Sequence, residues 1–289
     1  MLFPGVPKLV YDNIVPTGKF IELAFCPERI AQGNAMHGTR LTEVLNIVIP
    51  VYNEGSNFPA LWEELHTFIR APFVVHVVYD LDEDDTVPVV QAIIHTGEQR
   101  IRLVKNKEIH RGVVGAIASG FQAIRNGPVL LIMADLSDDL RQVDRMLELY
   151  AQGYDIVVGS RYMKGGRLIN PPRFKQALSR AAGVSLRWLR GIPTYDATNA
   201  FKIYDRAMLD SMTIESQIGF EVNLEITVKG FLCGYRIAEV PSTWRNRTRG
   251  SSRFRLWSWL PRYFKWYLYA FQPRGRVENR MRGSSSQTS

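Results

Sequence analysis

The chain has 289 residues, of which 46% are hydrophobic and 22% charged, which is enough to bury one sizeable core. Two widely separated cysteines exclude a disulfide framework and a cysteine zinc site, and no apolar run approaches the ~20 residues that cross a bilayer. The net charge of +8 is unevenly distributed along the chain. Residues 241–289 hold 11 Lys or Arg and one Glu, whereas residues 1–240 hold 25 Lys or Arg and 27 Asp or Glu. A basic C-terminal segment on a nearly neutral chain suits an anionic partner.

Residues 1–44 show no clear periodicity, and we treat them as an N-terminal extension of unknown role. From Leu45 onward, short β-branched runs alternate with stretches of helical spacing. The strands are expected over residues 45–52, 73–80, 100–106, 128–135 and 154–160, and the helices over 60–70, 114–125 and 143–153. This alternation predicts an α/β fold with a mostly parallel central sheet flanked by helices, in which ligands bind beyond the carboxyl ends of the strands.

The first two predicted strands end in polar residues. The first runs into "PVYNEG", which contains Pro50, Tyr52 and Glu54 but no glycine-rich loop, so a dinucleotide-binding fold or a P-loop enzyme is disfavoured. Taken alone, this stretch is an ordinary turn and helix cap. The second strand ends in "YDLDEDD", where some acids are expected to cap a helix and Asp80, nearest the strand, is the best candidate to contact a ligand.

The fourth predicted strand ends in "VLLIMADLSDD", which places Asp135, Asp138 and Asp139 directly after an apolar run. Hard divalent cations take oxygen ligands and are usually held by one or two carboxylates together with substrate phosphates. A helix cap at Ser137 or Asp138 is the alternative interpretation. Asp135 is therefore the principal candidate for a metal ligand.

Two basic stretches follow. "GSRYMKGGR" (159–167) and "NPPRFKQALSR" (170–180) offer anion contacts through Arg161, Lys164, Arg167, Arg173 and Lys175, although a solvated basic loop has the same composition.

The region from 244 to 271 combines basic residues with nine aromatic residues between Phe254 and Phe271, and Pro261 could begin a short helix there. Such a segment fits the surface of an anionic membrane, single-stranded nucleic acid, or an aromatic helix packed on its own domain or on a partner subunit. Nucleic acid is disfavoured because the basic residues are confined to this end of the chain. Residues 274–289 are expected to form a disordered tail.

Seven stretches taken in order carry a resemblance to a known family: "IVIPVYNE", "VVYDLDEDDT", "IMADLSDD", "IVVGSRYMKGG", "ATNAFKIYDR", "GFEVNLEITVKG" and "EVPSTWRNRTRGSSRF". Together they resemble family 2 glycosyltransferases with the GT-A fold, and are most similar to dolichol-phosphate mannose synthases and related polyprenyl-phosphate hexosyltransferases. The resemblance covers about residues 45 to 270. It implies a GT-A domain over 45–253 and a C-terminal amphipathic, interfacial segment over 254–273.

The resemblance also implies roles for individual residues, position by position. The residues implied to bind the donor nucleotide are Pro50, Tyr52, Glu54, Asp80, Ala134 and Arg253, and those implied in catalysis are Asp135, Arg161 and Arg247. The acceptor phosphate is expected to bind Lys175, Ser179 and Arg161. A Mg²⁺ or Mn²⁺ ion is expected to bind Asp135, Ser137 and Asp139. The main departure is Met133, which occupies the first position of the family's Asp-x-Asp motif and removes a ligand. Asp138 and Asp139 could cap the next helix or supply a water-mediated ligand that offsets this loss.

The implied activity is inverting transfer of a hexose, with mannose or glucose favoured, from a GDP- or UDP-sugar to dolichyl or undecaprenyl phosphate. The implied location is cytoplasmic, at the cytoplasmic face of an anionic membrane, and a homo-oligomer is compatible with the sequence. One alternative is a family 2 enzyme with a saccharide or protein acceptor, which needs a base to deprotonate a hydroxyl. A sugar-1-phosphate nucleotidyltransferase is disfavoured, because the glycine-rich loop that should follow its first strand is absent from this sequence. Met133 raises a further alternative, a catalytically silent nucleotide-sugar-binding protein.

Overall fold

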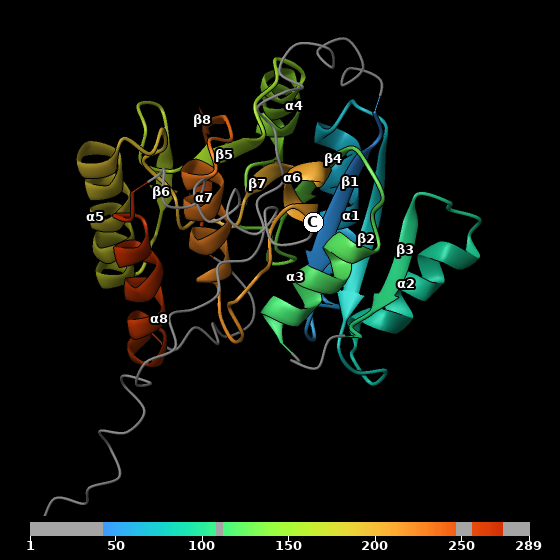
Figure 1. Ribbon diagram of the computed structural model, residues 1–289. Helices are drawn as coiled ribbons and strands as arrows, with labels where there is room; N and C mark the ends of the chain where they lie inside the picture. The colour runs from blue at the N-terminus through green and yellow to red at the C-terminus, as the bar shows by residue number, and fades with distance from the viewer. Residues whose placement is uncertain (1–42, 108–111, 247–255, 274–289) are drawn as a thin grey trace, which may run out of the picture.

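A computed structural model describes residues 43–107, 112–246 and 256–273 (Figure 1). The strands are β1 (Leu45–Pro50), β2 (Phe73–Tyr79), β3 (Ile101–Lys105), β4 (Pro128–Leu131), β5 (Ile156–Ser160), β6 (Arg167–Ile169), β7 (Lys202–Asp205), β8 (Ile237–Pro241) and β9 (Thr243–Arg245). The helices are α1 (Phe58–Phe68), α2 (Thr86–His95), α3 (Val113–Gln122), the 3-10 helix η3 (Leu140–Gln142), α4 (Val143–Ala151), α5 (Arg173–Arg190), α6 (Arg206–Asp210), α7 (Val222–Leu232) and α8 (Leu256–Tyr269).

Seven strands form one sheet in the order β3-β2-β1-β4-β7-β5-β8, and β6 pairs with β9 separately. Neighbouring strands are parallel throughout the large sheet, except that β7 runs antiparallel to both β4 and β5. The mostly parallel sheet confirms the prediction. The carboxyl ends of β1, β2, β4 and β5 therefore share one edge, and the amino end of β7 lies there too.

Helices cover both faces of the sheet, which explains why the central strands β4 and β5 are buried along their whole length. One core contains side chains of α1, α2 and α4, and the other contains side chains of α3, α6, α7 and α8. Along β1, Ile47 and Ile49 contribute to the first core and Val48 to the second, and all three are fully buried.

The helix α8 packs on its own domain through one of its faces. Trp266 and Ala270 are buried, and Trp266 Nε1 donates a hydrogen bond to Ser216 Oγ at 3.1 Å. The hydroxyl of Tyr267 donates to Ser185 Oγ of α5 at 3.0 Å, so α5 and α8 lie side by side (Figure 1). The intramolecular alternative for the aromatic region is thus correct for this face.

The position expected for Pro261 was wrong. It lies inside α8 instead of beginning it, because helical aromatic spacing continues on both sides, and the helix forgoes one i to i−4 hydrogen bond there. No helix in the described part of the chain is both long enough and apolar enough to span a membrane. The N-terminal extension up to residue 42 and the tail from 274 lie outside the described residues.

Candidate active site

The loop after β1 is held by the beginning of α2. Asn53 has a left-handed backbone conformation with φ of 54°, which turns the chain sharply at the end of the strand. Three consecutive backbone N–H groups donate to side chains at the start of α2: Asn53 to Asp84 Oδ2 at 3.1 Å, Glu54 to Thr86 Oγ1 at 3.0 Å, and Gly55 to Asp85 Oδ1 at 2.8 Å. This arrangement leaves the side chain of Tyr52 exposed at the sheet edge, next to the buried Pro50.

Asp80 at the end of β2 is half-buried and connects two segments of the same edge. Its Oδ1 accepts a hydrogen bond from Asn106 Nδ2, and its Oδ2 accepts one from the backbone of Gly112, both at 2.7 Å. The carboxylate is therefore fixed in orientation before any ligand binds. It remains capable of further contacts, because each carboxylate oxygen has two lone pairs.

The loop after β4 bends tightly around Asp135. Leu136 adopts φ of 59°, and the backbone N–H of Ser137 donates to Asp135 Oδ1 at 3.2 Å. The carbonyl of Ser137 accepts from the backbone of Arg245 at 2.9 Å, which ties the loop to β9. Ala134 is buried beneath it. Asp135 thus lies at the shared edge, on a loop with a defined backbone conformation.

Asp138 and Asp139 differ sharply in their surroundings. Asp139 receives two hydrogen bonds from Arg141, from Nε at 2.7 Å and from Nη2 at 3.1 Å. Asp138 accepts a backbone hydrogen bond from Met133, while its Oδ2 is shielded from solvent and has no hydrogen-bond partner. Burial and the nearby charge of Asp135 raise the pKa of Asp138 to about 7.

The expected capping role of these acids is not observed. Asp139 stands at the beginning of η3 and Gln142 at the beginning of α4, and neither side chain makes a capping hydrogen bond. The carboxylate of Asp139 is occupied by Arg141 instead, and that of Asp138 turns back to Met133.

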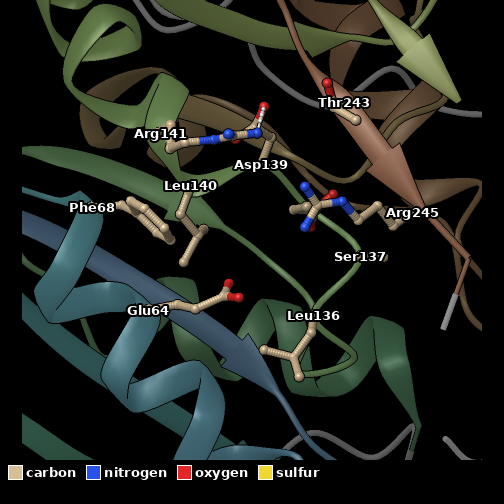
Figure 2. Close-up of a pocket in the computed structure, with 10 residues that line it drawn as sticks. Glu64, Phe68, Leu136, Ser137, Asp139, Leu140, Arg141, Thr243 and Arg245 are labelled. Atoms are coloured by element: carbon tan, nitrogen blue, oxygen red, sulfur yellow. Dashed lines mark hydrogen bonds and ion pairs between the residues drawn. The ribbon is translucent and has the colours of Figure 1, made fainter. Parts of the chain in front are cut away.

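A polar pocket adjoins this loop on the side of α1 (Figure 2). Its lining consists of Glu64, Phe68, residues 136–141, Thr243 and Arg245. Burial raises the pKa of Glu64, and the charges of Arg245 and Arg141 act against that shift. Two of the predicted metal residues, Ser137 and Asp139, line this pocket, whereas Tyr52 and Asp80 do not.

Arg161, directly after β5, is fixed by Asp196. Its Nε donates to Asp196 Oδ2 and its Nη2 to Asp196 Oδ1, both at 2.7 Å, and its backbone N–H donates to Oδ2 at 2.9 Å. The Asp196 side chain is fully buried and that of Arg161 is 15% exposed. Burial disfavours the charge of Arg161, but the charge and hydrogen bonds of Asp196 outweigh it and raise the arginine pKa.

The predicted acceptor residues come together on α5 and beside it. Lys175 and Ser179 are one helical turn apart and so share a face of the helix. Ser179 Oγ accepts a hydrogen bond from Arg161 Nη2 at 3.3 Å and bonds Thr198 Oγ1 at 2.7 Å. The helix lies very close to the 194–196 segment, because a Cβ added to Gly183 would meet the carbonyl oxygen of Tyr195 at 1.9 Å.

Sequence reasoning missed three residues of this region: Asp196, Thr198 and Lys202. Lys202 is fully buried and donates to the carbonyl oxygens of Ala197 and Asn223 and to Thr227 Oγ1, so it anchors the 196–199 segment to α7. A signal was present in "PTYDATNAFK", where charged residues stand among apolar ones and need buried partners. Arg247 and Arg253, which were also predicted site residues, lie outside the described residues.

The loop after β4 has a donor set that fits a hard divalent cation. Over residues 43–107, 112–246 and 256–273, no group of three or more His, Cys, Asp or Glu side chains could hold a metal ion. The oxygens available are the carboxylate of Asp135, the hydroxyl of Ser137 and the unpartnered Oδ2 of Asp138. This set suits a Mg²⁺-like ion that completes its coordination with substrate phosphates and water.

Comparisons with known proteins agree with this geometry. The profile of the family described as "Glycosyl transferase family 2" matches residues 46–213. The polyprenol monophosphomannose synthase of Mycolicibacterium smegmatis is 27% identical, over 74% of this chain and 82% of that protein. The undecaprenyl-phosphate mannosyltransferase of Micrococcus luteus is 31% identical, over 71% and 85%. The dolichol-phosphate mannosyltransferase of Pyrococcus furiosus is 27% identical, over 73% of this chain and 59% of that protein.

Solved structures show the same architecture. The glucosyl-3-phosphoglycerate synthase of Mycobacterium tuberculosis, crystallised with Mn²⁺, UDP and phosphoglyceric acid, superposes with a TM-score of 0.59 at 15% sequence identity, over 80% of this chain and 79% of that one. At this identity the likeness concerns the fold, and it confirms the expected GT-A architecture. The chain therefore belongs to glycosyltransferase family 2.

Proposed function

We propose that this glycosyltransferase moves a hexose, mannose or glucose, from a GDP- or UDP-sugar to a polyprenyl phosphate, with inversion at the anomeric carbon. The proposal includes peripheral attachment to the cytoplasmic face of a membrane. The mannosyltransferases to which the chain is similar carry names that specify dolichol phosphate, undecaprenyl phosphate or polyprenol as the lipid.

One observation carries the acceptor assignment: the anion-binding residues and exposed apolar residues lie on the same helix. Near its beginning, α5 bears Lys175 and Ser179, with Ser179 bonded to Arg161. Near its end, the same helix exposes Trp188 by 75% and Leu189 by 65%. A phosphate joined to a long hydrocarbon chain needs this combination of cationic and apolar surface.

In the proposed reaction, a phosphate oxygen of the acceptor attacks the anomeric carbon, and the bond to the nucleoside diphosphate breaks. The acceptor is already anionic near neutral pH, so no side chain has to remove a proton from it. Arg161 would hold the acceptor phosphate in position, and its fixed pairing with Asp196 means that little reorganisation is needed. Attack on the face opposite the leaving group converts an α-linked donor into a β-linked product.

On the donor side, Pro50, Tyr52, Glu54, Asp80 and Ala134 would bind the nucleotide, together with Arg253. Asp135 and Ser137 would hold a Mg²⁺ or Mn²⁺ ion. When bound, such an ion supplies charge stabilisation for the departing diphosphate. Arg247 would add positive charge to the same leaving group.

Exposed apolar side chains support the membrane part of the proposal. Among the described residues, ten large hydrophobic side chains are exposed, and six of these belong to α5, α8 or the residues just after it: Phe174, Trp188, Leu189, Phe264, Leu268 and Phe271. The two helices lie side by side and also carry basic residues, including Lys265 (Figure 1). Apolar and basic side chains together fit the interface of an anionic bilayer.

Replacing Phe264 and Leu268 by serine is expected to weaken binding to vesicles that contain anionic lipid by about tenfold or more. The two side chains are 56% and 52% exposed, and each apolar side chain that leaves water on binding contributes about 1.5 kcal/mol or more. Co-sedimentation with vesicles measures the effect. Deleting the whole segment would also remove the buried Trp266, so point substitutions are the cleaner change.

Val44→Ser provides the matched control, because Val44 is 44% exposed at the amino end of β1, at the sheet edge opposite the candidate site. Equal vesicle binding by the double variant and the unsubstituted protein would remove the membrane assignment.

The reaction itself is tested by incubating the purified protein with GDP-mannose, UDP-glucose and related donors and with dolichyl or undecaprenyl phosphate in vesicles, in Mn²⁺ or Mg²⁺. We expect a β-linked glycolipid with one donor, identified by mass spectrometry and anomeric NMR. Saccharides, a protein acceptor and 3-phosphoglycerate serve as alternative acceptors in parallel. Transfer to one of these, with none to the lipid phosphate, would contradict the proposal. Donor binding without any transfer would instead favour a silent binding protein.

A further inference from the structure

The loop after β4 lacks the acidic residue expected at position 133 but contains a buried carboxylate five residues later. Met133 takes the first position of the Asp-x-Asp motif, and Asp135 alone of the motif's two acids remains. The question is which group compensates for that loss. Asp138 and Asp139 are the two candidates on the same loop.

The hydrogen bonds distinguish the two acids. Both acids line the pocket beside α1, but the two carboxylate oxygens of Asp139 are occupied by Arg141 (Figure 2). The carboxyl group of Asp138 instead bonds the backbone of Met133, so it lies against the residue that has lost the ligand. Its Oδ2 is shielded from solvent and lacks a hydrogen-bond partner.

An oxygen in this state needs an explanation, because buried carboxylate oxygens are nearly always paired. Three nearby charges act on the Asp138 carboxylate: those of Asp135 and Asp196 disfavour its ionised form, and that of Arg161 favours it. All three residues belong to the candidate site described above. A divalent cation shared by Asp135 and Asp138 would satisfy the open oxygen and convert the repulsion between the two acids into attraction.

We propose that Asp138, and not Asp139, is the second carboxylate of the metal centre, and that it replaces the acidic side chain missing at Met133. This inference rests on the proposed function, since it assigns a ligand to the ion of that reaction. The hydrogen bond from the Met133 backbone holds the Asp138 carboxylate next to position 133. The centre then has two carboxylates, a number that suits an ion completed by diphosphate oxygens.

The test is titration of Mn²⁺ into the purified full-length protein with GDP or UDP present, with free Mn²⁺ followed by electron paramagnetic resonance. Asp138→Asn is expected to weaken Mn²⁺ binding by about 10–100-fold, because losing a group that supports a metal site typically lowers the metal affinity by this factor. Asp139→Asn, the matched control on the same loop, is expected to leave the Mn²⁺ affinity almost unchanged. A double variant, Met133→Asp with Asp138→Asn, should recover most of the lost affinity, because it returns a carboxylate to the neighbouring position.

Thermal unfolding gives an independent readout and guards against a folding defect. Without metal, Asp138→Asn should be at least as stable as the unsubstituted protein, since it removes a charge from a buried site. Saturating Mn²⁺ with nucleotide should raise the Tm of the unsubstituted protein more than that of the variant.

The possible failures are distinguishable. Normal Mn²⁺ binding by Asp138→Asn, or a loss confined to Asp139→Asn, would overturn the assignment of Asp138 and leave the proposed reaction intact. No Mn²⁺ binding by the unsubstituted protein with either nucleotide would overturn the metal centre as a whole, and with it this inference. The glycolipid assay described above decides the reaction separately.

Discussion

Replacing Asp135 by asparagine is expected to lower the rate of sugar transfer by about 10³-fold or more. Asp135 is the one carboxylate left of the Asp-x-Asp motif, and its loop is fixed by the hydrogen bond from Ser137 and by the link of Ser137 to Arg245. Asparagine keeps the size and an oxygen acceptor but removes the charge that neutralises a divalent ion. Loss of one preorganised electrostatic group costs about 10²–10³ in kcat, and loss of a primary metal ligand is expected to exceed this.

The measurement is the initial rate of glycolipid formation at saturating donor and acceptor, over a range of Mn²⁺ concentrations. A metal-binding role predicts that the defect shrinks as Mn²⁺ is raised, whereas a fold defect does not respond to metal. Asp139→Asn is the comparison, with a milder expected effect because Arg141 already occupies that side chain. A greater loss in Asp139→Asn than in Asp135→Asn would mean that the metal belongs to the other carboxylate.

Replacing Asp196 by asparagine is expected to cost about 3–5 kcal/mol of the free energy of unfolding and to reduce transfer by about 10²-fold. Asp196 is fully buried and receives three hydrogen bonds from Arg161 at 2.7–2.9 Å. Its removal leaves the guanidinium buried without a counter-charge, a change that typically costs this much. Arg161 would then lose the orientation in which it also contacts Ser179.

Urea unfolding measures the stability change, and the KM for polyprenyl phosphate measures the loss of acceptor positioning. The KM for the donor should change less, because Tyr52, Asp80 and Ala134, which are proposed to bind the donor, lie in the loops after β1, β2 and β4 and not beside Asp196 in the chain. Arg145→Gln is the control, since it breaks an ion pair with Glu148 in which the two side chains are 57% and 58% exposed, and it should cost no more than about 1 kcal/mol. A similar loss of stability in both variants would contradict the special role of the Asp196 pair.

The sheet was predictable from the sequence because the information is local. Five short β-branched runs separated by stretches of helical spacing produced the prediction of a parallel sheet, and the polar residues at the ends of four of these runs indicated the edge with the site. The direction of β7 was not predictable in this way. Its four residues, "KIYD", have the composition of a strand, but nothing local specifies antiparallel pairing with β4 and β5.

The candidate site was predictable where a residue's chemistry is visible in the sequence and not where the partner decides its state. Acidic or basic stretches of the sequence contain Asp135, Arg161 and Ser179. The structure places Arg161 beside Ser179. Asp196 was missed because its importance comes from a partner 35 residues away. Asp138 and Asp139 are adjacent and chemically identical, so only their hydrogen bonds separate them.

The reversed direction of β7 has a consequence for how this enzyme can diversify. Because β5 ends and β7 begins at the same edge, the intervening chain leaves that edge as β6 and α5 and returns to it at Asp196. The two ends of this excursion are joined by the hydrogen bonds between Arg161 and Asp196. Five of the residues proposed for the donor precede it in the chain: Pro50, Tyr52, Glu54, Asp80 and Ala134. A graft that exchanges this excursion would change the residues proposed for the acceptor, but it would have to preserve the pairing of β6 with β9, because Arg245 of β9 holds the loop after β4 through Ser137.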